Sequence, residues 1–161
     1  MGLFSIFKKN NKEMKIVSPV NGEILKIEEV PDEVFSTKMM GDGFAVKSND
    51  GLVVSPVDAE IKMVFDTKHA IGLETPEGLE LLLHFGIDTV KLAGEGFEVL
   101  VKAGDKVKAG DKLMQVNLDF IKENAKSDIT PIIFTNLEEG KSVQVETGVA
   151  TTGEVDRIKL L

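Results

Sequence analysis

The chain has 161 residues, of which 42% are hydrophobic and 29% charged, a composition that suits one globular domain with a substantial core. Its net charge is −8, which argues against nucleic acid as a partner, because neutralising phosphates requires a basic face. The sequence has no cysteine, so disulfides, thiolate chemistry and cysteine-ligated zinc are excluded.

Residues 1–13 are predicted to form a tail in front of the folded domain. An apolar cluster at residues 3–7 is followed by lysines, a pattern that fits either a loosely docked terminus or a short amphipathic helix at a membrane surface. We favour the loosely docked terminus, because short interfacial anchors are uncommon. The segment does not have the order of a secretory signal, and no apolar run approaches the roughly 18 residues of a membrane span. The sequence therefore predicts an intracellular, cytoplasmic protein.

From residue 14 to residue 161 the pattern is that of an all-β domain. Short runs of Val, Ile, Leu and Phe alternate with Gly, Pro, Asp and Asn, as in strands joined by turns. Residues 16–24 (IVSPVNGEI) recur as residues 53–61 (VVSPVDAEI), which indicates two related β-units that share one core. Two Gly-Asp steps within residues 101–113 predict tight turns between short strands.

One helix is predicted after these turns. Asn117 or Asp119 can cap its start, and Phe120 lies on its apolar face. Residues 131–134 then resume as a strand, and residues 157–161 are expected to close the sheet. The predicted fold is an all-β antiparallel sandwich or partly closed barrel with an internal duplicated motif and one or two short helices.

The only two histidines, His69 and His84, flank a segment that is predicted to be a β-hairpin. Residues 75–78 (TPEG) carry proline at the second turn position and glycine at the fourth, as a type I turn prefers. A hairpin folded about the middle of this turn sets the two imidazoles directly opposite each other, close enough to touch.

A second register of the same hairpin stays open. Shifted by one residue, it pairs Leu73 with Leu81, which suits the core better. It also sets His84 opposite Ala70 and turns His69 to the other face. A β-bulge between His69 and Ile71 would reconcile both demands, because one extra residue re-aims a side chain.

Five stretches of the sequence carry a family resemblance: residues 30–35 (VPDEVF), 38–43 (KMMGDG), 54–58 (VSPVD), 83–90 (LHFGIDTV) and 92–97 (LAGEGF). In this order they resemble the glucose-type enzyme IIA of the bacterial phosphoenolpyruvate-dependent sugar phosphotransferase system, the PTS EIIA type-1 family. The resemblance covers nearly the whole chain.

It implies one β-sandwich domain over residues 14–161, with a diagnostic core at about residues 33–137. Biotinyl and lipoyl carriers share the Gly-Asp hairpin, but the lysine that they display is missing here. Zinc metallopeptidases of related architecture need more histidines than this chain has.

The resemblance implies a phosphoryl relay. His84 would accept a phosphoryl group from the histidine phosphocarrier protein HPr and pass it to a cysteine of the IIB domain of a sugar permease. Imidazole suits this role, because it is a good nucleophile near neutral pH and a good leaving group once protonated. His69 would stabilise the phosphoryl oxygens, and Thr67 would orient the ring of His69. A backbone carbonyl such as that of Gly86 would hold the other ring nitrogen of His84.

The resemblance also implies a docking surface around the histidines. Leu82 shares the face of His84 by strand alternation. The positions that match the family's apolar collar are Val34, Phe35, Met39, Met40, Phe65 and Val90, and those that match its acidic rim are Asp32 and Asp88. An apolar disc with an acidic rim suits transient docking, since burial supplies affinity and charge supplies rate and orientation.

This relay requires no cofactor. His69 and His84 could ligate zinc only with a ligand from a partner protein, because two ligands are too few for a standing site. Regulatory binding of other enzymes or transporters is an alternative that is compatible with the relay. Phosphorylation would place charge at the centre of the apolar disc and expel partners that bury it.

Overall fold

The computed structural model describes residues 14–161, and the tail predicted for residues 1–13 lies outside this part of the chain. None of the helices within residues 14–161 combines the length and apolar character needed to cross a membrane. The strands are β1 (Gly22–Lys26), β2 (Gly43–Ser48), β3 (Leu52–Val54), β4 (Ala59–Val64), β5 (Ala70–Glu74), β6 (Glu80–His84), β7 (Phe97–Val99), β8 (Lys106–Val107), β9 (Lys112–Val116), β10 (Thr130–Phe134), β11 (Val143–Val145), β12 (Gly148–Ala150) and β13 (Ile158–Leu160). The helices are η1 (Ile27–Glu29), α2 (Glu33–Ser36), η2 (Val90–Leu92) and α3 (Leu118–Asn124).

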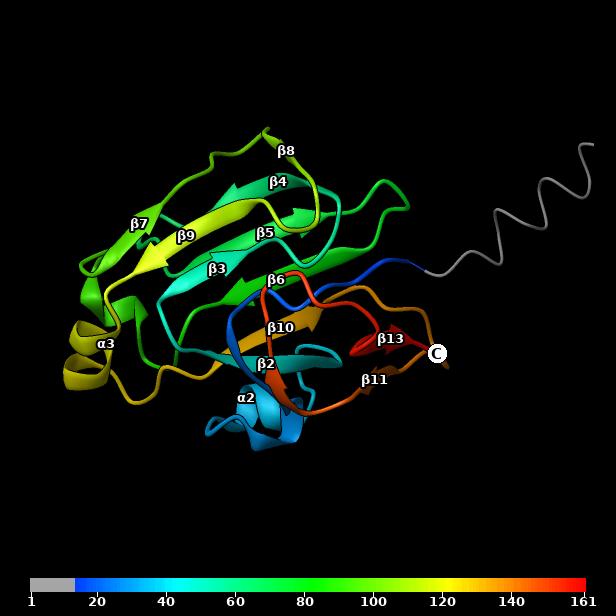
Figure 1. Ribbon diagram of the computed structural model, residues 1–161, viewed down its shortest axis with the longest axis horizontal. Coiled ribbons are helices and arrows are strands. Elements are labelled where there is room, and N and C mark those ends of the chain that lie inside the picture. Colours follow the sequence, from blue (N-terminus) through cyan, green and yellow to red (C-terminus); the bar gives the residue numbers. More distant parts are fainter. Residues whose placement is uncertain (1–13) are drawn as a thin grey trace, which may run out of the picture.

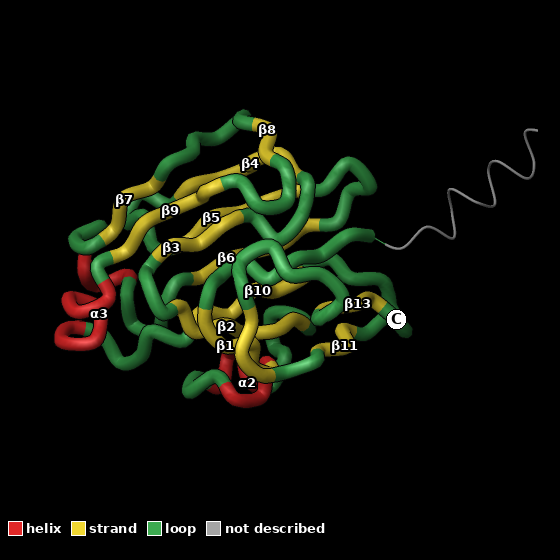
Figure 2. The backbone as a smooth tube through the Cα atoms, viewed as in Figure 1, coloured by secondary structure: helices red, strands yellow, loops and turns green. Residues whose placement is uncertain are grey.

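The strands form three antiparallel sheets, which confirms the predicted all-β class (Figures 1 and 2). The main sheet has eight strands in the order β12-β1-β2-β10-β6-β5-β4-β8, and a second sheet has the order β3-β9-β7. The last strand, β13, pairs with β11 in a separate two-stranded sheet. The prediction that residues 157–161 close the main sheet is therefore wrong, although they do contain a strand.

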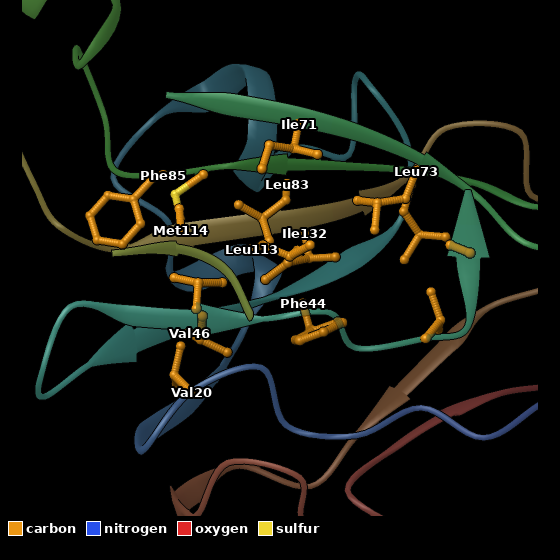
Figure 3. Close-up of a cluster of buried hydrophobic side chains, with 14 of the residues drawn as sticks. Val20, Phe44, Val46, Ile71, Leu73, Leu83, Phe85, Leu113, Met114 and Ile132 are labelled. Carbon is orange, nitrogen blue, oxygen red and sulfur yellow. The ribbon is translucent and has the colours of Figure 1, made fainter. Parts of the chain in front are cut away.

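The core lies between the eight-stranded and the three-stranded sheet (Figure 3). Alternate residues of the central strands point into it, among them the fully buried Phe44, Leu83 and Ile132. They meet Leu113 and Met114 of β9 from the other side. Each such side chain contributes roughly 1.5–3 kcal/mol when it is fully buried. This burial anchors β6, the strand that ends at His84.

A smaller apolar cluster lies beside η1 and α2. It consists of Ile27, Val30, Phe35, Ala45, Ile87 and Ile133. α2 begins at Asp32, whose carboxylate accepts a hydrogen bond from the Val34 N–H at 2.8 Å, a normal N-cap. This cluster seats the short helix against the sheet close to the end of β6.

The repeated motif forms two units that exchange hydrogen bonds. The Val17 N–H donates to the Pro56 carbonyl, and the Val54 N–H donates to the Pro19 carbonyl, each at 2.8 Å. In both units the buried serine of the Ser-Pro step donates to the carbonyl two residues on, at 2.9 and 2.6 Å. The similarity in sequence is therefore also a similarity in structure.

The predicted turns and helix cap are confirmed. Gly104 and Gly110 have φ values of +95° and +98°, and Asp105 and Asp111 each accept a backbone N–H from three residues earlier. Asn117 caps α3 by accepting the hydrogen bond of the Phe120 N–H at 3.1 Å.

Candidate functional site

β5 and β6 form the predicted hairpin, but in the shifted register. His84 faces Ala70, so the prediction that the two histidines are directly opposed is wrong. The turn is closed by the Gly78 N–H, which donates to the Thr75 carbonyl at 2.9 Å, and Gly78 has a φ of +92°. A left-handed glycine after the turn adds one residue to the hairpin loop, which shifts the register by one.

His69 reaches the site by a left-handed bend rather than by the expected β-bulge. It lies just before β5, and the preceding Lys68 has a φ of +62°. The Phe85 N–H donates to the His69 carbonyl at 2.7 Å and holds this bend against the end of β6. The imidazole centroids of His69 and His84 are 4.7 Å apart, and the rings are nearly perpendicular at 83°. The predicted contact of the two rings is confirmed, by a different backbone path.

Each imidazole is held through its Nδ1 atom. His84 Nδ1 lies 2.8 Å from the Gly86 carbonyl oxygen. Because a carbonyl only accepts, Nδ1 carries the proton and Nε2 keeps a free lone pair. His69 Nδ1 lies 2.7 Å from Thr67 Oγ1, and a hydroxyl that donates to Nδ1 leaves the ring proton on Nε2. Thr67 lies in the turn before β5.

The two rings can therefore take opposite roles. The Nε2 atom of His84 keeps a lone pair and can act as a nucleophile. The Nε2–H group of His69, a residue only 3% exposed, can act as a hydrogen-bond donor beside it. The ring of Phe35 lies 5.1 Å from that of His84, and the ring of Phe65 lies 5.5 Å from that of His69. Aromatic packing thus restricts both imidazoles from the side.

Burial keeps both histidines neutral. Burial first, and then the neighbouring His84, lower the pKa of His69 from its ordinary 6.5 to about 4. Burial also lowers the pKa of His84, against the hydrogen bond to Gly86, which raises it. A neutral imidazole near pH 7 has the free lone pair that a nucleophile needs.

We expect the free energy of unfolding to fall as the pH drops from 6.5 to about 4. In this window the unfolded chain binds a proton at His69 that the folded protein excludes, so protonation favours unfolding. The contribution of His69 is at most about 3 kcal/mol, at 1.36 kcal/mol per pKa unit. Urea unfolding at several pH values in this range measures how steeply the free energy of unfolding depends on pH. We expect this dependence to be weaker in His69→Gln. An unchanged slope in the variant would assign the effect to other groups.

The residues expected to form the apolar collar differ in exposure. Val34, Met39, Met40 and Val90 are 41%, 74%, 39% and 55% exposed, as residues of a docking surface should be. Phe65 and Leu82 are half-buried. Phe35 departs from the expectation: it is only 6% exposed and packs against the ring of His84. It therefore shapes the site more than it offers area to a partner.

The two expected rim carboxylates have different settings. Asp32 is engaged as the cap of α2, and it also raises the pKa of His84 slightly by its charge. Asp88 is exposed and has a left-handed backbone with a φ of +62°. Such a conformation strains a residue other than glycine, and strained residues gather at functional sites.

Met63 is a surface residue that sequence reasoning missed. Strand alternation places it in the core beside Ile61, but the β4–β5 register shifts between these two residues. As a result Met63 is 49% exposed and pairs with Gly72, which in turn pairs with Leu82. The apolar surface beside His84 therefore extends onto β4. A bulge of this kind leaves no mark in the hydrophobic pattern.

No group of three or more histidine, aspartate or glutamate side chains within residues 14–161 is arranged to hold a metal ion. His69 and His84 together offer two nitrogen ligands at most. A zinc ion at this pair would need at least one more ligand from another protein.

Gly86 is the glycine on which the position of His84 depends. It has a φ of +71°, and a Cβ atom there would lie 2.7 Å from both the Ser127 carbonyl oxygen and Thr89 Cγ2. We expect Gly86→Ala to lower the free energy of unfolding by roughly 2–4 kcal/mol, because the left-handed backbone and the clash add up.

The matched control is Gly78→Ala. Gly78 is also left-handed, but a Cβ atom there meets no atom of the described residues within 4 Å. We expect Gly78→Ala to lower the free energy of unfolding by only about 1 kcal/mol, the cost of the left-handed backbone alone. Urea denaturation of both variants makes the comparison, and equal losses would contradict the role of close packing at Gly86.

The chain is similar to known proteins over most of its length. The family model for the phosphoenolpyruvate-dependent sugar phosphotransferase system, EIIA 1, matches residues 14–140. The PTS system glucose-specific EIIA component of Bacillus cereus is 52% identical over 150 residues, which is 93% of this chain and 90% of that protein.

Two further relatives extend this similarity. The PTS system glucose-specific EIICBA component of Staphylococcus carnosus is 57% identical over 130 residues, 81% of this chain but 19% of that longer protein. Among solved structures, glucose permease IIA from Mycoplasma capricolum aligns with a TM-score of 0.87 and 43% identity, covering 92% of this chain and 97% of that one.

Proposed function

Because the chain belongs to the EIIA type-1 family of the phosphoenolpyruvate-dependent sugar phosphotransferase system, which relays phosphoryl groups in sugar uptake, we propose that His84 carries the phosphoryl group. The protein is a phosphotransferase component, and its intermediate is a phosphohistidine at His84. The observation that carries this proposal is the 2.8 Å contact of His84 Nδ1 with the Gly86 carbonyl oxygen, which assigns the ring proton to Nδ1 and leaves the Nε2 lone pair beside His69.

In the first step, His84 Nε2 attacks the phosphorus of a phosphohistidine on HPr. A new P–N bond forms, the bond to the donor breaks, and its electron pair returns to the donor imidazole. The transition state is loose and spreads charge over three equatorial oxygens, so the protein mainly positions groups and stabilises charge. The Nε2–H group of His69 donates to one of these oxygens, and Thr67 keeps its ring in place.

In the second step, the thiolate of a IIB cysteine attacks the same phosphorus, and the P–N bond to His84 breaks. The phosphorylated ring is cationic while Nδ1 keeps its proton, and the hydrogen bond to the Gly86 carbonyl stabilises that charge. A cationic imidazole is a good leaving group, so one hydrogen bond serves both halves of the relay.

HPr and the IIB domain are the proposed partners, and both would use the collar around the histidines. The name of the EIICBA relative places EIIA-like sequence within a longer protein of the same system, which supports a IIB partner. The net charge of −8 and the carboxylates Asp32 and Asp88 favour partners with basic docking faces.

Met39→Lys is expected to weaken docking. Met39 is 74% exposed, so the charge should raise the KM for phosphorylated HPr about tenfold, the effect of losing one interface anchor. The control is Val149→Lys on edge strand β12, a residue 84% exposed and separated from β6 by three strands. Both variants should keep their stability within about 0.5 kcal/mol. An equal rise in KM for both would mean that general charge, not the collar, is responsible.

The proposed function is tested with phosphoenolpyruvate, enzyme I, HPr and this protein together. We expect the mass of one added phosphoryl group, labile in acid and stable in alkali, on the peptide that contains His84. Phosphate on His69 instead, or no phosphate at all while HPr is loaded, would overturn the proposal.

The same surface supports regulated binding as a second function. A phosphoryl group on His84 would add a charge of about −1.5 to −2 amid Val34, Met40 and Val90, which repels any partner that buries them. Pull-down with phosphorylated and unphosphorylated protein tests this, and adding a chelator tests whether a shared zinc ion at the histidine pair contributes.

A further inference from the structure

We propose that Thr130 is a positioning residue for the phosphoryl relay. Its hydroxyl fixes the turn at Gly86, whose carbonyl holds the proton on His84 Nδ1. This inference rests on the proposed role of His84 as the phosphoryl carrier. Thr130 begins β10, far from His84 in the sequence, and does not touch the imidazole itself.

The hydroxyl of Thr130 both accepts and donates a hydrogen bond. Its oxygen accepts the hydrogen bond of the Gly86 N–H at 3.3 Å, and its proton is donated to the Asp128 carbonyl at 3.1 Å. Thr130 is completely buried, so water does not compete for either bond. With its proton directed to Asp128, the oxygen has a lone pair directed to Gly86.

The segment before Thr130 holds the next peptide of the same turn. The Gly86–Ile87 peptide accepts from His84 Nδ1 through its carbonyl and donates to the Ser127 carbonyl through the Ile87 N–H at 2.9 Å. Hydrogen bonds linked through a peptide group polarise and strengthen one another. The N–H groups of Gly86 and Ile87 thus donate to Thr130 and Ser127, and the Gly86 carbonyl accepts from His84.

This support matters because the turn is tightly packed. Gly86 adopts a φ of +71° in a space that has no room for a Cβ atom, and the buried Thr89 hydroxyl donates to the Phe85 carbonyl to close the turn from within. Without the Thr130 hydroxyl, the buried Gly86 N–H would have no acceptor. An unpaired buried donor costs more free energy than a hydrogen bond of which both partners are removed. If the turn relaxes, His84 Nδ1 loses its acceptor, and the tautomer with the proton on Nε2 becomes populated. That tautomer has no lone pair on Nε2 and cannot attack through this atom.

The experiment compares Thr130→Val with Thr130→Ser. Valine keeps the shape of threonine and removes both hydrogen bonds, whereas serine keeps the hydroxyl. Nitrogen-15 spectra of the imidazoles in the unphosphorylated protein report the tautomer of His84, and the rate of loading from phosphorylated HPr reports function. We expect Thr130→Val to show the Nε2–H tautomer and to load about tenfold more slowly, and Thr130→Ser to stay within about twofold of wild type.

Thr75→Val is the matched control. Thr75 is also a buried threonine, and its hydroxyl accepts the Leu79 N–H at 3.1 Å at the far end of the same hairpin. We expect Thr75→Val to lower the free energy of unfolding about as much as Thr130→Val does. The nitrogen-15 spectrum of His84 and the rate of loading should remain those of the wild type. A Thr130→Val protein with the wild-type tautomer and rate overturns the proposal, and so does an equal effect of Thr75→Val.

A measurement on the wild-type protein covers the case in which Thr130→Val does not fold. The Gly86 amide should be strongly protected from hydrogen exchange, and fast exchange would overturn the proposal. Failure of the wild type to load at His84 would instead refute the proposed function, while the tautomer spectra and the amide exchange still decide the role of Thr130.

Discussion

His84→Gln is expected to abolish phosphoryl loading completely. Glutamine offers an amide whose nitrogen has no free lone pair for attack at phosphorus, so no intermediate can form. The fold should survive, because His84 is only partly buried and the hydrogen bond that its side chain makes to the Gly86 carbonyl is lost without disturbing the strand pairing. The measurement is the mass of the variant after incubation with phosphoenolpyruvate, enzyme I and HPr.

The control for this result is the stability of the same variant. Urea unfolding should show a folded protein, so that the absence of phosphate reports the loss of the nucleophile. Acid-labile phosphate on folded His84→Gln would show that another residue carries the phosphoryl group.

His69→Gln is expected to separate the two halves of the relay. Loading should survive, because His84 Nε2 still attacks, whereas onward transfer to a IIB cysteine should fall by about 10²–10³, as when one preorganised donor to a developing charge is removed. The second step is more sensitive because an anionic thiolate approaches an anionic phosphoryl group. The Nε2–H group of His69 offsets that charge at 4.7 Å between ring centres.

The measurement follows transfer of labelled phosphate from the purified phosphoprotein to a IIB domain. Thr67→Val is the graded control: the imidazole of His69 stays, but its Nδ1 loses the partner at 2.7 Å. Its onward rate should lie between those of wild type and His69→Gln. A His69→Gln protein that delivers phosphate at the wild-type rate would remove His69 from the mechanism.

The sequence predicts which imidazoles come together better than it predicts the backbone path that unites them. The contact of His69 with His84 is confirmed. Of the two registers left open, the one that opposes the histidines is wrong, and the one that pairs Leu73 with Leu81 is observed. The difference comes from Gly78, whose left-handed conformation lengthens the loop, and from Lys68, which is left-handed although lysine has no preference for that region. Neither conformation can be read from the pattern of apolar residues.

The sequence also does not predict which residues far apart in the chain contact each other. Residues 157–161 contain the predicted strand, but alternation identifies a strand and not the neighbour with which it pairs. For the same reason nothing in the residues around His84 points to Thr130. The repeat and the Gly-Asp turns were predictable because their signals are local: Ser-Pro and Gly-Asp steps favour the same turns wherever they occur.

The strand order of the main sheet also bears on how a newly made chain becomes active. β5 and β6 are joined by a short turn, so the two histidines can meet through an early, local folding event. β10 takes its place between β2 and β6 only after a long loop closes, which is slow. The hydrogen bond from the Gly86 N–H to Thr130 can form only when β10 is in place. We therefore expect refolding chains to bring the imidazoles together first and to gain the capacity to accept phosphate last.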